Sequence, residues 1–203
     1  MSEPPSRRAR KRERTFRNLL DATAALIAEG GTADLRISDI TARADVALGS
    51  FYNYFASKEE IVDAVARETL TALAASLAEG DAATADDDVA IAARAIRRFV
   101  ELAREDELLA RLLVNLSAGD AVFVSSVHPA ARLAVERGVE HGRFTVGSVE
   151  LSVVAITGGA LALVRAIIDG RDVGREPGRE LAERSLLALG VPADEAARVA
   201  ARA

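Results

Sequence analysis

The stretch of sequence that decides the fold runs from residue 37 to residue 61 and reads ISDITARADVALGSFYNYFASKEEI. Four of the eight aromatic residues of the chain lie in it, between positions 51 and 55. On a helix Phe51 and Phe55 share one face, whereas Tyr52 and Tyr54 point elsewhere. The spacing therefore predicts a short helix with buried phenylalanines and exposed tyrosines. The alternative is a dense core helix that buries all four rings, but a buried tyrosine hydroxyl needs a hydrogen-bond partner.

Helical periodicity continues on both sides of this stretch. Apolar residues at three- and four-residue steps over 16–27 predict an amphipathic helix, which Gly30 and Gly31 end. Ser57 is suited to cap a helix that runs to about residue 80. Further helices are expected at about 89–104, 107–116, 148–169, 180–189 and from 191 onward. Between 120 and 141 we expect a broken helix whose second piece starts at Pro129. With 42 alanines, five prolines and no convincing strand pattern, the sequence predicts an all-α fold.

The composition excludes several kinds of chemistry. The absence of cysteine rules out a disulfide scaffold, a thiol nucleophile and cysteine-based metal sites. Only His128 and His141 are present, too few for a multi-histidine metal centre. Residues 86–88 are three consecutive aspartates, which we interpret as the cap of the next helix and not as a cation site. No nucleophile elbow, phosphate loop or paired-carboxylate spacing appears, so we expect no enzyme, no cofactor and no metal.

The charge is distributed unevenly along the chain. The net charge is −5, but residues 1–58 carry ten basic and seven acidic residues, whereas residues 59–203 carry 16 and 24. Seven of the basic residues lie between positions 7 and 17, where Glu13 is the one acidic residue. This end of the chain can meet phosphates, and the small residues Gly49 and Ser50 would let the short aromatic helix enter a DNA major groove.

Two features bear on the cellular location. No apolar segment follows the basic start, which argues against a signal peptide. The longest uncharged apolar stretch, residues 151–164, has 14 residues and is shorter than the roughly 20 that span a bilayer. We therefore expect a cytoplasmic, soluble protein without a membrane partner.

Residues 37–61 closely resemble the DNA-binding motif of the TetR (tetracycline repressor) family of bacterial transcription regulators. That motif is a short isoleucine-bearing helix, a turn with valine, a recognition helix ending in Tyr-x-x-Phe, and Ser-Lys-Glu-Glu. The resemblance covers roughly residues 10–70. It implies an N-terminal arm and three-helix DNA-binding domain with a helix-turn-helix over residues 1–58. It also implies a larger helical domain for effector binding and dimerisation over residues 59–203.

The resemblance implies a role for individual positions of the motif. Residues at positions of phosphate contact are Tyr52, Tyr54 and Lys58. Residues at the groove-facing start of the recognition helix, where bases are read, are Ala47, Leu48, Gly49 and Ser50. Asn53 is on an exposed side and suits either role. Residues at core positions are Ile40, Val46, Phe51 and Phe55. Phosphate contacts would fix the register, and only the groove residues would select the sequence.

Three positions depart from the family pattern. Arg36 stands where the family has a Ser or Thr cap on the second helix, so Ser38 caps instead or Arg36 itself touches phosphate. Asp45 replaces the usual turn glycine, and aspartate tolerates a left-handed conformation better than most residues. Ala47 replaces the polar cap of the recognition helix and removes one potential hydrogen bond.

The helix expected at 148–169 is apolar nearly all round, which predicts burial on every side. It carries a stripe of small residues that would let two helix axes come close: Ser152, Ala155, Gly159, Ala162 and Ala166. Packing within one chain is one explanation of the stripe. The other is a subunit interface, because members of the family pair their last two long helices into a four-helix bundle. We expect a homodimer through residues 148–169 and 180–189.

The resemblance also implies a central pocket for a small-molecule effector of unknown identity. Residues expected on helices around it are Arg98, Phe99, Leu112, Asn115, Phe123 and Arg132. A mainly apolar pocket would suit a hydrophobic or aromatic molecule, although each of these residues can also belong to the ordinary core or surface. The resulting interpretation is a repressor released from a palindromic operator by a small molecule. The alternative is a helical small-molecule-binding or scaffold protein with a vestigial helix-turn-helix. The two differ in sequence-specific, salt-sensitive DNA binding.

Overall fold

The computed structural model describes residues 6–78, 87–117 and 121–202; for residues 76–78 and 121–127 it describes the backbone only. Within these ranges the chain forms ten helices and no strand, which confirms the all-α fold. The helices are α1 (Arg7–Gly30), α2 (Ile37–Arg43), α3 (Leu48–Phe51), α4 (Lys58–Ala78), α5 (Asp88–Glu105), α6 (Glu107–Ser117), α7 (Ala121–Glu140), α8 (Val149–Ile168), α9 (Pro177–Ala188) and α10 (Ala193–Arg202).

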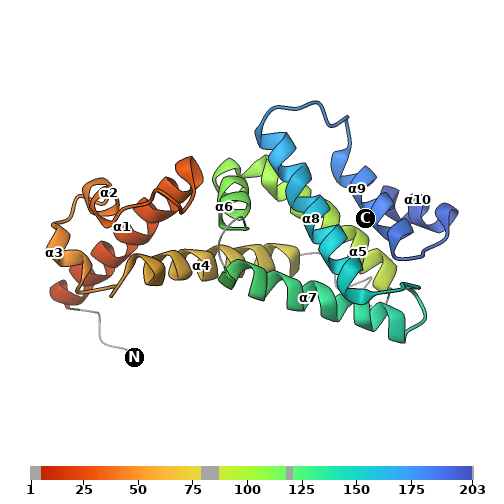
Figure 1. Cartoon of the computed structure of the whole chain (residues 1–203), viewed down its shortest axis with the longest axis horizontal. Helices are drawn as coiled ribbons and strands as arrows, with labels where there is room; N and C mark the ends of the chain where they lie inside the picture. The colour runs from red at the N-terminus through yellow and green to blue at the C-terminus, as the bar shows by residue number, and fades with distance from the viewer. Residues whose placement is uncertain (1–5, 79–86, 118–120, 203) are drawn as a thin grey trace.

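The first three helices gather at one end of the molecule, and α4 runs from that end toward the others (Figure 1). Their core contains the fully buried side chains of Leu19, Ile40, Phe51 and Ile61. The same hydrophobic cluster continues into α6 through buried leucines such as Leu113. The expected domain boundary at residue 58 coincides with the first residue of α4, and apolar packing is continuous across it.

The other helices enclose a second hydrophobic core. Helix α5 packs against α9, α10 packs on α9, and α8 contacts both α6 and α7 (Figure 1). Buried members of this core include Val89, Phe144, Val153 and Leu186. This arrangement leaves α6 between the two parts of the molecule, because α6 contacts α1 on one side and α8 on the other.

A buried carboxylate ties the start of α5 to the end of α7. Asp87 caps α5, since its side chain accepts a hydrogen bond from the Val89 N–H, and this confirms the expected cap; Asp86 lies outside the described residues. The Asp88 side chain is 5% exposed and accepts hydrogen bonds from Arg137 Nε at 2.7 Å. Its other oxygen lies 2.7 Å from His141 Nδ1. Burial alone would raise the pKa of Asp88, but these hydrogen bonds outweigh it and the pKa is lowered.

Two expectations about the helices are wrong. Helix α7 continues through Pro129 and is not broken there. A proline inside a helix removes one backbone hydrogen bond, at a cost of about 3 kcal/mol, so the contacts of α7 with α4 and α8 must hold the helix together. The aromatic helix is also shorter than expected, because α3 ends at Phe51. Single hydrogen bonds from Asn53 N to Ser50 O and from Phe55 N to Phe51 O then continue the winding as a turn.

Helix α8 is buried on one side only, at Val153, Ala160 and Val164, so the expected burial on every side is wrong for the single chain. The uncovered face carries small and apolar residues: Leu151, Val154, Ala155, Gly158 and Ala162. The helix has 20 residues and extends beyond the uncharged stretch at both ends, so that it includes the charged residues Glu150 and Arg165. Among the described helices it is the one long and apolar enough to cross a membrane by length and composition. The 14-residue uncharged stretch is thus part of a longer apolar helix, but a single helix of this kind is weak evidence for a membrane span.

Candidate nucleic-acid interface

Helices α2 and α3 form a helix-turn-helix whose turn depends on Asp45. This residue has φ 55°, in the left-handed region that glycine normally occupies. The helices lack side-chain caps: neither Arg36 before α2 nor Ala47 before α3 accepts a capping hydrogen bond. Ser38 is not the cap of α2 either, because it lies inside the helix, where its hydroxyl donates to the Asp39 carboxylate at 3.4 Å. Backbone bonds such as Ser50 N to Ala47 O, at 2.8 Å, start α3 instead.

Two buried phenylalanines anchor α3, as expected. Phe51 is fully buried and Phe55 is 4% exposed, and their ring centroids lie 5.8 Å apart. Phe16 of α1 stacks on Phe55 at 5.4 Å, which fixes α3 against α1. Tyr52 is 59% exposed, whereas Tyr54 is half-buried. Tyr54 is therefore less exposed than the spacing predicts, and its hydroxyl-bearing ring is part of the seam between α1 and α3.

The burial of Phe51 turns the start of α3 outward. Ala47, Leu48, Gly49 and Asn53 are exposed, and Ser50 is half-buried. Leu48 has 53% of its surface exposed. A Cβ added to Gly49 would meet no atom within 4 Å, so packing inside the chain does not require a glycine there. The residues expected to read bases therefore lie together on one open surface.

The start of α4 lies beside this surface. Ser57 caps α4 as expected, with its hydroxyl accepting a hydrogen bond from the Glu60 N–H at 3.2 Å. Lys58, the first residue of the helix, is half-buried, and its Nζ lies 3.5 Å from the carbonyl oxygen of Thr32. Arg36 is exposed at the start of α2. The termini of α2 and α4 thus place cations next to α3, where phosphates on either side of a groove would lie.

Two exposed ion pairs join helices at the DNA-binding end of the molecule, one between α2 and α1 and one between α1 and α4. Arg43 at the end of α2 makes two hydrogen bonds of 2.7 Å to Glu29 of α1, which lower the pKa of that carboxyl. Arg17 of α1 pairs with Glu68 of α4, and this hydrogen bond raises the pKa of Arg17. Both pairs are exposed and contribute little stability. They occupy two arginines that would otherwise be available to a partner.

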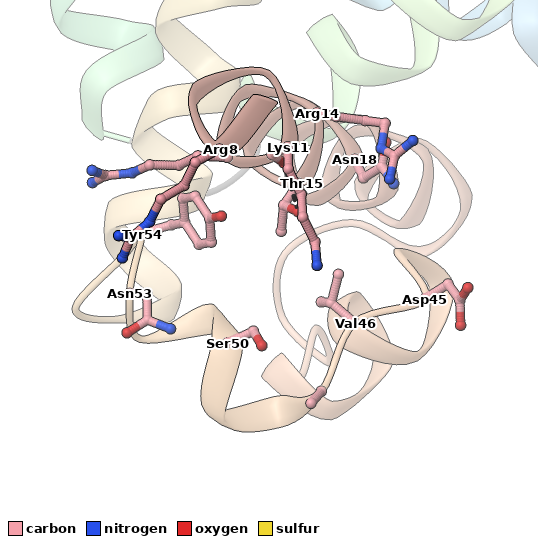
Figure 2. A pocket seen from close by; sticks show the side chains of 12 residues that line it. Arg8, Lys11, Arg14, Thr15, Asn18, Asp45, Val46, Ser50, Asn53 and Tyr54 are labelled. Carbon is pink, nitrogen blue, oxygen red and sulfur yellow. Dashed lines mark hydrogen bonds between the residues drawn. The ribbon is translucent and has the colours of Figure 1, made fainter. Parts of the chain in front are cut away.

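A basic groove lies between α1 and α3 (Figure 2). We name it the α1–α3 groove; it has a volume of about 940 Å³. Its lining residues from α1 are Arg8, Lys11, Arg12, Arg14, Thr15 and Asn18, and those from the helix-turn-helix are Asp45, Val46, Ala47, Ser50, Asn53 and Tyr54. The basic run is evident in the sequence, but the DNA-contacting positions predicted from the sequence include no residue of α1. A signal was present, since positions 8, 11, 12 and 15 share one face of a helix.

The six residues expected around an effector pocket lie in different surroundings, and their role in a ligand site stays a prediction. Leu112 is buried in the first core, and Phe99 packs against the core clusters. Asn115 donates to carbonyl oxygens of α1. The remaining placements are as follows: Arg98 pairs with Glu105, Arg132 pairs with Glu136 and Glu150 on the surface, and the side chain of Phe123 lies outside the described residues.

The five residues of the small stripe lie along α8 but differ in exposure. Ala155 and Ala162 are exposed, whereas Ser152, Gly159 and Ala166 are half-buried. A Cβ on Gly159 would lie 4.0 Å from Leu181 of α9, so that position packs within the chain. The stripe therefore serves two surfaces, and its open part is centred on Ala155 and Ala162.

Comparisons with known proteins cover both ends of the chain. The family described as "Tetracyclin repressor-like, C-terminal domain" matches residues 87–202, and "Bacterial regulatory proteins, tetR family" matches residues 19–65. The HTH-type transcriptional repressor KstR of Rhodococcus jostii is 45% identical over 53 residues, which are 26% of this chain and 25% of KstR. The uncharacterized HTH-type regulator YvdT of Bacillus subtilis is 39% identical over 56 residues, 28% of this chain and 29% of YvdT. The match thus spans less than a third of either relative.

Similarity to solved structures extends over nearly the whole chain. The crystal structure of RolR in complex with its ligand resorcinol has a TM-score of 0.72 at 28% identity, covering 96% of this chain and 97% of RolR. A structure of RolR without ligand has a TM-score of 0.70 at 27% identity, covering 92% of this chain and 97% of that one.

Proposed function

Because the chain belongs to the TetR family of bacterial regulatory proteins, we propose that it is a homodimeric, cytoplasmic repressor released from a palindromic operator by a small molecule. Proteins of this family are transcriptional regulators and not generally enzymes. The observation that carries the proposal is the open start of α3, where Leu48 and Gly49 face outward because Phe51 is buried behind them.

The surface supports two kinds of DNA contact. Leu48 can make apolar contact with a thymine methyl group, and Ser50 and Asn53 can hydrogen-bond to base edges in the major groove. Tyr52 and Lys58 flank these residues and would contact phosphate oxygens, which fixes the register of α3 without selecting a sequence.

Fragments of the source genome selected by binding would supply the operator, and two variants then test the contacts. Lys58→Ala should weaken binding on all duplexes alike and reduce the salt slope by roughly one unit. Leu48→Ala should alter the preference for operator over random duplex instead. Arg175→Ala removes an exposed charge from the loop after α8 and should change neither quantity. If no fragment is selected, the scaffold alternative is favoured. If both of the first two variants bind a selected operator like the wild type, the contacts assigned to Leu48 and Lys58 are wrong.

We propose that the dimer forms through the uncovered face of α8 together with α9, where Leu187 is 44% exposed. Leu151 and Val154 are also exposed on α8, at 69% and 47%, and a second copy would cover them. Ala155→Arg tests this proposal, because Ala155 is exposed and its replacement does not disturb the core of its own chain. Sedimentation should then show monomers, and the operator affinity should fall because a palindrome needs two linked recognition helices. A wild-type protein that sediments as a monomer at micromolar concentration would contradict the proposal.

We propose an apolar or aromatic effector that binds among α5, α6 and α7. The support is the likeness to RolR, whose structure contains resorcinol, over nearly the full length of both chains. Resorcinol is therefore the first probe, titrated with and without operator. An inducer must bind more weakly to the DNA-bound protein, by the same factor, typically about 5–150-fold, by which it weakens DNA binding. Equal affinities in the two titrations would mean that the compound tested is not an inducer.

A further inference from the structure

We propose that the α1–α3 groove binds the sugar-phosphate backbone of one DNA strand. Helix α1 is then itself part of the DNA interface and not only a support for the helix-turn-helix. The inference rests on the proposed DNA binding and adds a second backbone contact to it. It differs from the contacts of Tyr52 and Lys58, because it is made by α1, the helix that precedes the helix-turn-helix.

The groove has the charge of a phosphate site. Its lining holds four cations, Arg8, Lys11, Arg12 and Arg14, against one carboxylate, that of Asp45. Lys11 points from α1 into the opening, with the helix-turn-helix forming the opposite wall (Figure 2). A strand of DNA carries one negative charge per 3.4 Å along the helix axis, and such a partner would neutralise the excess charge.

The cations of the groove are available. Within the described residues, Arg8 and Lys11 form no ion pair, unlike Arg17 and Arg43 further along the chain. Both side chains are exposed. Arg12 is held over the Tyr54 ring, with its guanidinium 6.0 Å from the ring centroid. A cation–π contact of this kind orders the side chain without cancelling its charge.

The groove is continuous with the surface that would read bases. Ser50 and Asn53, on the outward side of α3, also form part of its wall. A residue that touches a base edge is therefore next to the proposed phosphate strand, which is the relation between bases and backbone within a duplex. The distance along α1 from Arg8 to Thr15 is about 10 Å at 1.5 Å per residue, enough to follow two or three phosphates.

The matched experiment compares two double variants of the full-length protein. Arg8→Ala/Lys11→Ala removes two cations that line the groove, and Arg7→Ala/Arg10→Ala removes two cations of the same two turns that do not line it. The change in net charge and in helix propensity is the same, and all four side chains are exposed. Binding is measured by fluorescence anisotropy on a selected operator duplex and on a random duplex, from about 50 to 200 mM salt.

Each lost phosphate contact lowers the salt slope by about 0.9, so the groove variant should lose nearly two units on both duplexes. The control variant should lose less than about half a unit, and the preference for operator should stay unchanged in both. Equal losses in the two variants would mean that the basic run acts as a diffuse field, and a larger loss in the control would place the strand on the other face. Either result overturns the inference. The proposed function is judged separately, since Lys58→Ala and Leu48→Ala must still act in the wild-type background.

Discussion

Removing the side-chain amide of Asn115 should loosen the contact between α6 and the DNA-binding helices. Its Nδ2 donates to the carbonyl oxygen of Ile27 at 2.9 Å and to that of Ala28 at 3.2 Å. Both carbonyls belong to the last turn of α1, where helix carbonyls lack intrahelical partners. Ile27 keeps a second donor, the Gly31 N–H at 2.8 Å. The loss in Asn115→Ala is therefore one full hydrogen bond and part of another, about 1–2 kcal/mol in the free energy of unfolding.

For a chain of this size, that loss corresponds to a fall in Tm of roughly 3–6 °C. The assay is denaturant unfolding at a fixed protein concentration, because a dimer would make the midpoint concentration-dependent. Hydrogen exchange of the Gly31 amide reports the local effect. Arg165→Ala is the control: it removes a 3.3 Å bond to the Asn115 side-chain oxygen but leaves both donations to α1 intact. A cost below about 0.3 kcal/mol for Asn115→Ala, or an equal cost in the control, would refute the reasoning.

Three further substitutions have directions set by the structure. Gly138→Ala should destabilise the protein by about 1–3 kcal/mol in thermal unfolding, because the new Cβ would lie 2.1 Å from the ring of the buried Phe144. Asp45→Gly should raise the free energy of unfolding by about 0.5–1 kcal/mol, since it relieves a positive φ. Asp88→Asn should cost about 1–2 kcal/mol at neutral pH, through the loss of charge-assisted bonds such as that to His141. Because the folded pKa of Asp88 is lowered, this contribution is present above the unfolded value of about 3.9 and is lost as the pH falls through the folded pKa; an unfolding difference that persists at low pH would contradict it.

Local signals predicted the helices well where a cap or a period determined them. Ser57 caps α4, and Phe51 and Phe55 are buried, because these features depend on neighbours within one or two turns. Pro129 could not be placed in this way. Its local preference for a first turn is overridden by the packing of α7 on α4 and α8, which involves residues far apart in sequence.

Sequence patterns could not say which molecule covers a given apolar face. The sequence pattern of an all-round apolar helix such as α8 is the same whether its own chain or a second copy buries it. In the single chain Leu151 and Val154 are exposed. The candidate site has the same limit. The base-facing positions follow from the motif, but Arg8 and Lys11 belong to the groove only because Phe16 and Phe55 fold α1 back against α3.

Helix α1 joins the two ends of the proposed switch. Its first turns line the groove beside α3, its middle stacks on Phe55 through Phe16, and its last turn is held by Asn115 of α6. With 24 residues it is a single helix about 36 Å long, so a displacement imposed at one end reaches the other. For the proposed release from the operator, an effector must bind the state with low DNA affinity more favourably than the DNA-binding state, by about 1–3 kcal/mol. The contacts of Asn115 contribute about 1–2 kcal/mol. If the DNA-bound state keeps these contacts and the effector-bound state breaks them, α1 can transmit much of that coupling from α6 to the groove.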